Sequence, residues 1–185
     1  MSEERTLGRY GSPFLQAYIQ RETWGFDSCL EFGFGVGAYT NSVLCPTIHG
    51  IELFASYYEE AKQREELKGV EFFLGDMRRF DEITSRDYDV ALFIDTLEHI
   101  TKEDALDLLG RCQKRFKKII LFIPIGEEFQ GNQDWYDDNP AQKHLSTWNL
   151  DELTSMGFAG TYNATFHSHL PTGYQGAAFL TWVRP

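Results

Sequence analysis

The chain has 185 residues, and 28 acidic against 17 basic side chains give it a formal net charge of −11. That length fits one domain, and the 42% hydrophobic residues are enough for a large core, which excludes a disordered or fibrous chain. Because phosphate recognition depends on clustered Lys and Arg, the acidic charge argues against a nucleic-acid or anionic-membrane partner and favours a small molecule.

The cysteines and the N-terminus indicate the compartment. Cys29, Cys45 and Cys112 form no Cys-x-x-Cys pair, so neither a disulfide framework nor a structural zinc site is indicated. The first residues lack the apolar core of a signal peptide, and no apolar run is long enough to span a membrane. We therefore expect a cytoplasmic protein.

The hydrophobic pattern predicts alternating strands and helices. Apolar residues at helical spacing predict an amphipathic helix over residues 13–24, within an N-terminal segment of residues 1–27. Continuous apolar runs predict buried strands at residues 29–32, 48–53, 70–74, 88–94 and 118–123. Helices are expected over residues 55–67 and 101–116, and the stretch up to Leu44 after the first strand can also be helical.

The last forty residues break this rhythm. They predict a helix over 149–156 and two strands, 160–169 and 177–183, whose short connection favours an antiparallel hairpin. The expected fold is a single α/β domain over residues 1–185. Its doubly wound seven-stranded sheet would be mostly parallel, with the antiparallel hairpin at the C-terminus.

A glycine-rich turn follows the first predicted strand. Gly33, Gly35 and Gly37 let the backbone turn sharply and let a ligand approach the main chain. Gly33, Gly35 and Ala38 also satisfy the dinucleotide pattern G-x-G-x-x-G/A, so an NAD-binding oxidoreductase is a possible alternative at this point.

Carboxylates recur at the ends of the predicted strands, where ligands bind in open α/β sheets. They are Glu31, Glu52, Asp76 and Asp95. Such a ring would repel the pyrophosphate of NAD, whereas S-adenosylmethionine carries a sulfonium and an ammonium group. The acids therefore favour a cationic cofactor.

Four motifs in order along the chain resemble those of the class I S-adenosylmethionine-dependent methyltransferases. They are Leu30-Glu31-Phe32-Gly33-Phe34-Gly35-Val36-Gly37, Gly50-Ile51-Glu52-Leu53, Phe73-Leu74-Gly75-Asp76-Met77, and residues 88–100, which include Asp95 and His99. Phe34 departs from the family pattern, in which small or polar residues are more familiar.

The resemblance implies a role for each cofactor-binding residue. Gly33, Gly35 and Gly37 would wrap the methionine part of S-adenosylmethionine, with Glu31 near its amino group. Glu52, beside Leu53, would hold the ribose hydroxyls. Asp76 would accept from the adenine amino group with Met77 beside the ring, and Asp95 would border the methionine end.

Residues 125–148 are predicted to form a substrate loop, because they are long and have little regular pattern. We expect Tyr136, Asn139, His144 and Trp148 to bind a small acceptor such as a sugar or another metabolite. His144 is the first candidate for a general base and His99 the second. A hydrogen bond that merely staples the loop is an equally good reading of His144.

No metal site is expected. Asp137, Asp138 and Asn139 are oxygen ligands of the kind magnesium prefers, but they lie in mid-loop and fit a turn before Pro140. The predicted function is methyl transfer to a small molecule. A non-catalytic module that binds S-adenosylmethionine and regulates a partner is a further alternative.

Overall fold

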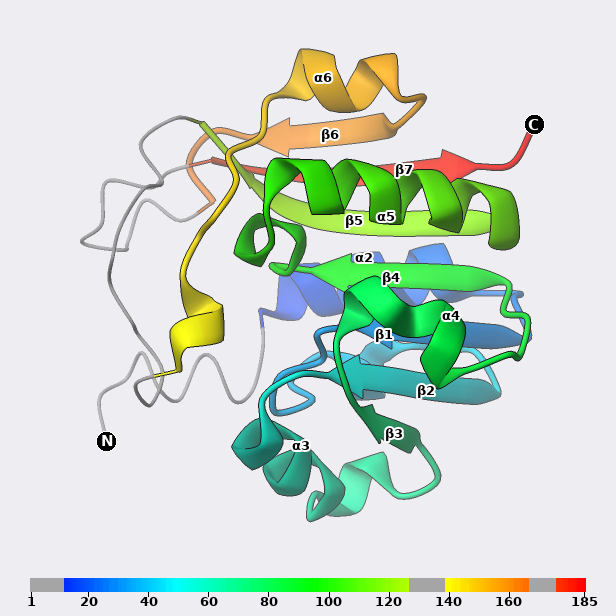
Figure 1. Ribbon diagram of the computed structural model, residues 1–185. Helices are drawn as coiled ribbons and strands as arrows, with labels where there is room; N and C mark the ends of the chain where they lie inside the picture. The colour runs from blue at the N-terminus through cyan, green and yellow to red at the C-terminus, as the bar shows by residue number, and fades with distance from the viewer. Residues whose placement is uncertain (1–11, 127–138, 167–175) are drawn as a thin grey trace. The chain divides into compact units, whose positions relative to one another are not determined.

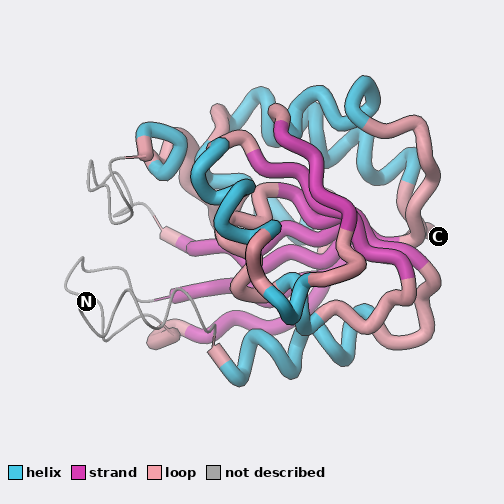
Figure 2. The backbone as a smooth tube through the Cα atoms, turned by 90° about the horizontal axis from the view of Figure 1, so that it is seen from below, coloured by secondary structure: helices cyan, strands magenta, loops and turns pink. Residues whose placement is uncertain are grey.

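The computed structural model describes residues 12–126, 139–166 and 176–185. Seven strands are hydrogen-bonded in the order β3-β2-β1-β4-β5-β7-β6, and the seven-stranded sheet that the sequence predicts is confirmed (Figure 1). The chain divides into two compact units, residues 1–92 and 93–185, which are described in turn. The succession of helix, strand and loop can be followed in Figure 2.

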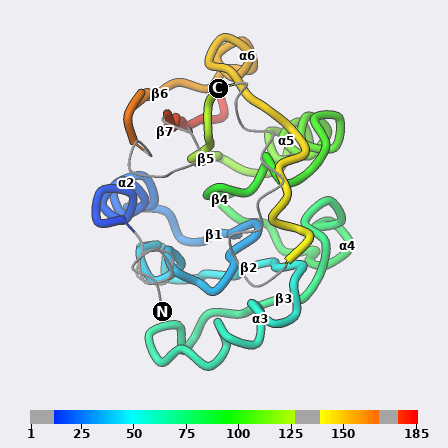
Figure 3. The backbone as a smooth tube through the Cα atoms, turned by 90° about the vertical axis from the view of Figure 1, so that its left-hand side faces the viewer, coloured from blue at the N-terminus to red at the C-terminus, as the bar shows by residue number. Residues whose placement is uncertain are grey.

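The first unit is built on three parallel strands. They are β1 (Ser28–Phe32), β2 (Thr47–Glu52) and β3 (Glu71–Leu74), which run side by side in Figure 3. All five residues of β1 are buried, as expected of a strand covered on both faces. The register pairs Phe32 with Ile51 and Glu52 with Leu74, so the carboxyl ends of the three strands lie close together.

Helices of the first unit are short except for α2. They are α2 (Pro13–Thr23), α3 (Ala55–Lys62) and α4 (Phe80–Ile83), with β4 (Val90–Ile94) ending the unit and beginning the next. The apolar face of α2 buries Leu15, Tyr18 and Ile19, which follow helical spacing. The helix predicted over 55–67 is interrupted: α3 ends at Lys62, and a 3-10 helix follows at Glu65–Leu67.

The second unit joins one long helix to an antiparallel group of strands. It contains α5 (Lys102–Arg115), β5 (Lys118–Ile125), α6 (Leu150–Ser155), β6 (Ala159–Asn163) and β7 (Gly176–Val183). The β7 strand pairs antiparallel with both β5 and β6, which confirms the predicted hairpin. The strand predicted over 160–169 is shorter than expected: β6 ends at Asn163, residues 164–166 form a turn, and residues 167–169 lie outside the described residues.

The termini of α5 show why the sequence folds this way. The hydroxyl of Thr101 accepts a hydrogen bond from the backbone N–H of Asp104 at 3.2 Å and caps the helix. Acidic residues fill the first turn and basic residues the last, which suits the helix dipole. The helix lies along β5 in Figure 1 and buries Ala105, Leu108 and Cys112. Within the described residues, no helix is long and apolar enough to cross a membrane.

Candidate functional site

The glycine-rich turn leaves the end of β1 in a left-handed backbone. The φ angles of Gly33, Gly35 and Gly37 are 66°, 56° and 76°, a region that side chains rarely tolerate. The N–H of Gly33 donates to the carbonyl of Ile51 at 2.8 Å. The chain therefore bends tightly beside the end of β2.

The helix that the sequence allowed up to Leu44 is not present. Residues 35–39 form turns, and a 3-10 helix of three residues, Thr40–Ser42, follows. A dinucleotide site places its pyrophosphate at the N-terminus of an α-helix directly after this turn. The absence of that helix from these fully described residues argues against the NAD alternative.

Glu52 closes the turn from the end of β2. One carboxylate oxygen accepts from the N–H of Gly35 at 2.9 Å, and the other accepts from the N–H of Phe54 at 2.7 Å. Burial raises the pKa of this carboxyl, and these backbone hydrogen bonds lower it in part. Each oxygen keeps a further lone pair for a ligand hydroxyl. Leu53, next in the chain, is exposed.

Glu31 is a buried acid with an unsatisfied oxygen. Its residue is 2% exposed, and its Oε2 atom has no hydrogen-bond partner among the described residues. Burial raises the pKa of Glu31 to about 7, and the nearby Glu52 carboxylate adds to this, while Thr40 opposes it. The Thr40 hydroxyl makes no hydrogen bond within the described part of the chain, so it offsets the effect of burial on the Glu31 pKa only in part. A cationic group near Glu31 would find an acceptor already in place.

The carboxylate of Asp76 is bound by Arg78, two positions later in the chain. It accepts a hydrogen bond from the backbone N–H of Arg78 at 2.9 Å and a salt bridge from the Arg78 guanidinium at 2.6 Å. Partial burial raises the pKa of Asp76, but these contacts outweigh it, so the pKa lies below its usual range. Met77 begins the 3-10 helix Met77–Arg79, which Asp76 caps. A ligand that used Asp76 would share it with Arg78.

The unusual Phe34 is explained by packing. Its ring lies against Phe72, with ring centroids 4.4 Å apart, in a cluster with Ala61 and Leu67. A Cβ atom at Gly50 would stand 2.6 Å from the Phe34 ring, so only glycine leaves room there. Phe34 therefore anchors the glycine-rich turn to the hydrophobic core of the first unit.

In the second unit, Asp95 follows β4 with a φ of 45°, the left-handed value that Asp tolerates better than most residues. Its N–H donates to the carbonyl of Phe122 at 3.0 Å. The residue as a whole is exposed, but its carboxyl is surrounded by protein, and this burial raises the pKa of Asp95 to about 7. The chain then enters the 3-10 helix Leu97–His99.

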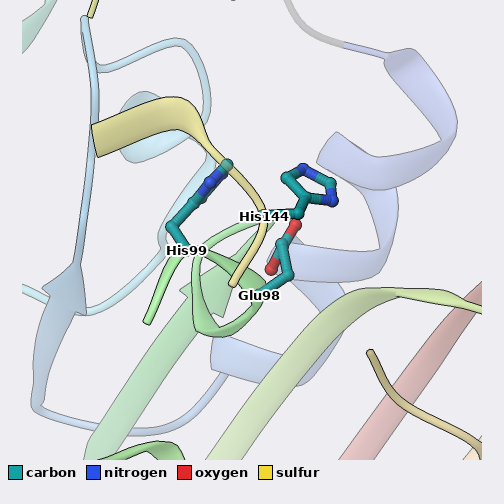
Figure 4. Close-up of side chains that lie close together, drawn as sticks. All are labelled: Glu98, His99 and His144. Carbon is teal, nitrogen blue, oxygen red and sulfur yellow. The ribbon is translucent and has the colours of Figure 1, made fainter. Parts of the chain in front are cut away.

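Glu98, His99 and His144 lie together in this unit (Figure 4). One ligand atom from each, a carboxylate oxygen or a ring nitrogen, lies within 4.8 Å of the others. The two imidazole rings meet edge to face, with centroids 4.8 Å apart. The structure thus brings together both histidines that the sequence singled out.

Backbone hydrogen bonds explain how residues 139–148 reach this turn. The carbonyl of Glu98 accepts from the N–H groups of Leu145 at 2.7 Å and Ser146 at 3.1 Å. The Ser146 hydroxyl donates to the carbonyl of Leu97 at 3.2 Å. His144 is therefore held beside Glu98 by bonds on the residues that follow it.

Burial keeps both histidines neutral at pH 7. It lowers the pKa of His99 to about 4, although hydrogen bonds to the backbone of Lys143 and Gln142 raise it in part. Burial also lowers the pKa of His144 to about 3, and the adjacent His99 adds to this. The pKa of Glu98 is raised well above its usual range by burial and by the charge of Asp95.

The remaining substrate-loop residues lie inside the protein or outside the described ranges. Asn139 is 1% exposed and caps the 3-10 helix Pro140–Gln142 through Ala141. Trp148 is 2% exposed: its indole N–H donates to Ser146, and the Lys102 ammonium stands 3.5 Å from its ring centroid. Tyr136 and residues 137–138 lie outside the described residues. Trp148 thus packs the loop down, and its contact with an acceptor stays a prediction.

Glu98 is the residue that the sequence analysis passed over. It lies inside the fourth motif, three positions after Asp95 and directly before His99. An acid and a histidine next to each other on the turn after a buried strand are a signal for a shared site, but burial of the acid and the approach of His144 come only from the fold.

No protein-family model matches the chain, and no curated protein sequence matches it. Solved structures do. The DhpI–SAH complex is 17% identical, covers 93% of this chain and 85% of its own, and has a TM-score of 0.64. An S-adenosylmethionine-dependent methyltransferase from Clostridium acetobutylicum is 13% identical, with 92% and 91% covered and a TM-score of 0.66.

The small RNA methyltransferase HEN1 is 13% identical and has a TM-score of 0.66 over 99% of this chain, which spans 25% of that protein. At these identities the likeness concerns the fold. Together with the sheet order and the antiparallel pairing of β7, it leads to one conclusion. The chain has the fold of the class I S-adenosylmethionine-dependent methyltransferases.

Proposed function

We propose that this chain transfers a methyl group from S-adenosylmethionine to a small-molecule acceptor such as a sugar or another metabolite. The observation that carries the proposal is the left-handed glycine turn closed by Glu52 at the carboxyl ends of β1 and β2. DhpI, a neighbour with the same fold, was solved with SAH. The acidic edge of the first unit suits a cofactor with two positive charges.

The first unit would hold the cofactor. Glu52 would accept hydrogen bonds from the ribose hydroxyls with the lone pairs that Gly35 and Phe54 leave free. The cofactor ammonium near Glu31 would compensate the burial of that carboxylate and lower its raised pKa. Asp76 and Met77 would receive the adenine.

Methyl transfer is an in-line displacement. A lone pair of the acceptor forms a bond to the methyl carbon, the electrons of the carbon–sulfur bond pass to sulfur, and S-adenosylhomocysteine (SAH) leaves. A hydroxyl acceptor must also lose its proton. His144 and His99 are the proposed proton acceptors, and both are neutral at pH 7. Because their pKa values are so low, they would orient the hydroxyl better than they would hold its proton.

Cysteine chemistry and net charge support the proposed compartment and class of acceptor. All three cysteines are buried and none is in a disulfide, which suits the reducing cytoplasm. The net charge of −11 disfavours a long nucleic acid, even though HEN1 by its name acts on small RNA. A small acceptor is therefore the proposal.

Binding of SAH to a Glu52 variant tests this proposal. Glu52→Ala should weaken binding by roughly 1–3 kcal/mol, the scale of charge-assisted hydrogen bonds, as measured by calorimetric titration. Glu59→Ala, on the exposed face of α3, is the matched control and should bind like the natural chain. Glu52→Gln, which keeps an acceptor for Gly35, separates loss of the ligand contact from loosening of the turn.

An NAD-binding oxidoreductase and a regulatory module, the two alternatives, would give different results in binding and turnover assays. A thermal-shift panel should show stabilisation by S-adenosylmethionine and SAH and none by NADH. Stabilisation by NADH alone would overturn the proposal. Tight SAH binding without SAH formation from any pool of acceptors would favour a regulatory module instead.

A further inference from the structure

The Glu98, His99 and His144 side chains form a cluster that the proposed cofactor roles do not use. Glu98 and His99 come from the turn after β4, and His144 comes from a segment more than forty positions later in the chain. Three chemically suitable ligand atoms, one oxygen and two nitrogens, lie within 4.8 Å of one another. A metal site needs suitable ligand atoms that converge on one point in this way.

The cluster contains polar atoms that lack partners. Glu98 is 1% exposed, yet its Oε2 atom makes no hydrogen bond within the ranges that the structure describes. The same holds for Nδ1 of His99. A buried carboxylate oxygen without a partner is costly, and native proteins almost always satisfy it. A bound cation would satisfy the oxygen and the ring nitrogen at once.

The surrounding backbone holds the three side chains in place. Leu145 and Ser146 donate to the carbonyl of Glu98 and so fix both the turn and the position of His144. Ser146 is fixed in turn by Leu97 and Trp148. Outer contacts of this kind orient metal ligands.

The donor set selects the kind of ion. Imidazole nitrogen favours zinc, iron, cobalt and their neighbours, whereas magnesium and calcium prefer sites made of oxygen. Ligands about 2.1 Å from a tetrahedral zinc-sized ion lie ~3.4 Å apart, so the most widely separated pair of the cluster, within 4.8 Å, would have to close by up to about 1.4 Å on binding.

We propose that Glu98, His99 and His144 bind one divalent first-row transition-metal ion, such as zinc, iron or cobalt. Three protein ligands leave coordination positions open for water or for an acceptor oxygen. If methyl transfer is the function, the ion would polarise the acceptor hydroxyl and take over the work that two weakly basic histidines do poorly. That role rests on the proposed function, but the metal site itself does not.

The test is a titration of the full-length, chelator-treated chain with cobalt chloride in the absence of S-adenosylmethionine. Cobalt is chosen because its visible absorption reports nitrogen and oxygen ligands directly, and competition with zinc gives a second affinity. The natural chain should bind one ion, and His144→Ala and Glu98→Gln should each lower the affinity by at least about tenfold. Absence of binding by the natural chain, or binding by both variants with the affinity of the natural chain, would overturn the proposal.

The matched control is a second histidine–carboxylate pair. His49 Nε2 and Glu71 Oε2 lie 3.1 Å apart on β2 and β3, with Glu71 exposed. Glu71→Gln should leave cobalt binding unchanged. Because Glu98 is buried and its variant can unfold, thermal unfolding of each protein is recorded, and the partly exposed His144→Ala decides the outcome if Glu98→Gln is not folded.

The outcome is separable from that of the proposed function. Cobalt binding is read without cofactor or turnover, so a chain that binds metal and never forms SAH would refute methyl transfer and keep the metal site. A chain that binds SAH and forms it from acceptors, but binds no cobalt, would refute only the metal site.

Discussion

At the scale of single residues, the chain places acids where ionisation is costly. Glu31 is the clearest case, since burial raises its pKa from the ordinary 4.5 to about 7. Between pH 4.5 and about pH 7, the Glu31 carboxyl is ionised in the unfolded chain but keeps its proton in the folded chain. The contribution of Glu31 to stability is therefore largest below pH 4.5 and is lost as the pH rises towards 7.

Glu31→Gln should consequently raise the free energy of unfolding of the cofactor-free chain above pH 7, by roughly 1–3 kcal/mol relative to its effect at pH 4. Urea unfolding of both proteins at the two pH values measures the difference. Glu98, whose pKa is also raised, is present in both proteins, so its contribution cancels. An effect of the same size at both pH values would mean that Glu31 carries no extra proton.

Local pattern was sufficient to find Glu31, Glu52 and Asp76, because a carboxylate at the end of an apolar run can be read from neighbouring letters. The local pattern does not predict the partners of these carboxylates. The salt bridge between Arg78 and Asp76 and the hydrogen bond from Gly35 to Glu52 depend on turns, and these turns form only when the strands pair.

At the scale of elements, the ends of six strands were predicted within two residues, and the sheet class and the C-terminal hairpin were confirmed. The strand predicted over 160–169 was too long, because β6 ends at Asn163 and residues 164–166 form a turn. Continuous apolar runs are a strong signal for buried strands. Among the helices, the one predicted over 55–67 was wrong at its end. The interruption of α3 coincides with a long-range contact, in which the Arg64 guanidinium donates to the carbonyl of Val36 at 3.0 Å. The sequence around Arg64 does not predict that hydrogen bond.

The glycine-rich turn depends on the same kind of distant packing. Phe34→Ala should destabilise the chain by about 3–5 kcal/mol, because it removes a buried ring from the cluster with Phe72 and Leu67. Denaturant unfolding measures this. The exposed Phe14 on α2 provides the control, and Phe14→Ala should change stability far less.

SAH affinity should fall in parallel in Phe34→Ala at a temperature where the variant is still folded, since the turn loses its anchor. Unchanged affinity and stability together would show that the turn keeps its shape without Phe34.

At the scale of the whole molecule, the proposed tasks are divided along the chain. The glycine turn, Glu31, Glu52 and Asp76 belong to residues 1–92, whereas His99, His144 and Glu98 belong to residues 93–185. Sequence motifs locate the first set, because its members lie next to strand ends, while their role in cofactor binding stays a prediction. The motifs do not predict how the second set comes together, because His144 reaches Glu98 only through backbone bonds of the residues after it.

This division predicts that binding and turnover separate in one variant. His144→Gln should leave the dissociation constant of SAH within about twofold, because none of the proposed cofactor contacts involves residue 144. Turnover with an identified acceptor should fall by about 10²–10⁴-fold if His144 takes the proton or holds the metal, and much less if it only orients the acceptor. The pH profile distinguishes the first two roles, since loss of a base flattens it, whereas loss of a metal ligand is relieved in part by excess cobalt. Full turnover by His144→Gln, with SAH affinity intact, would remove His144 from the reaction and leave it as a residue that staples residues 139–148 to the turn after β4.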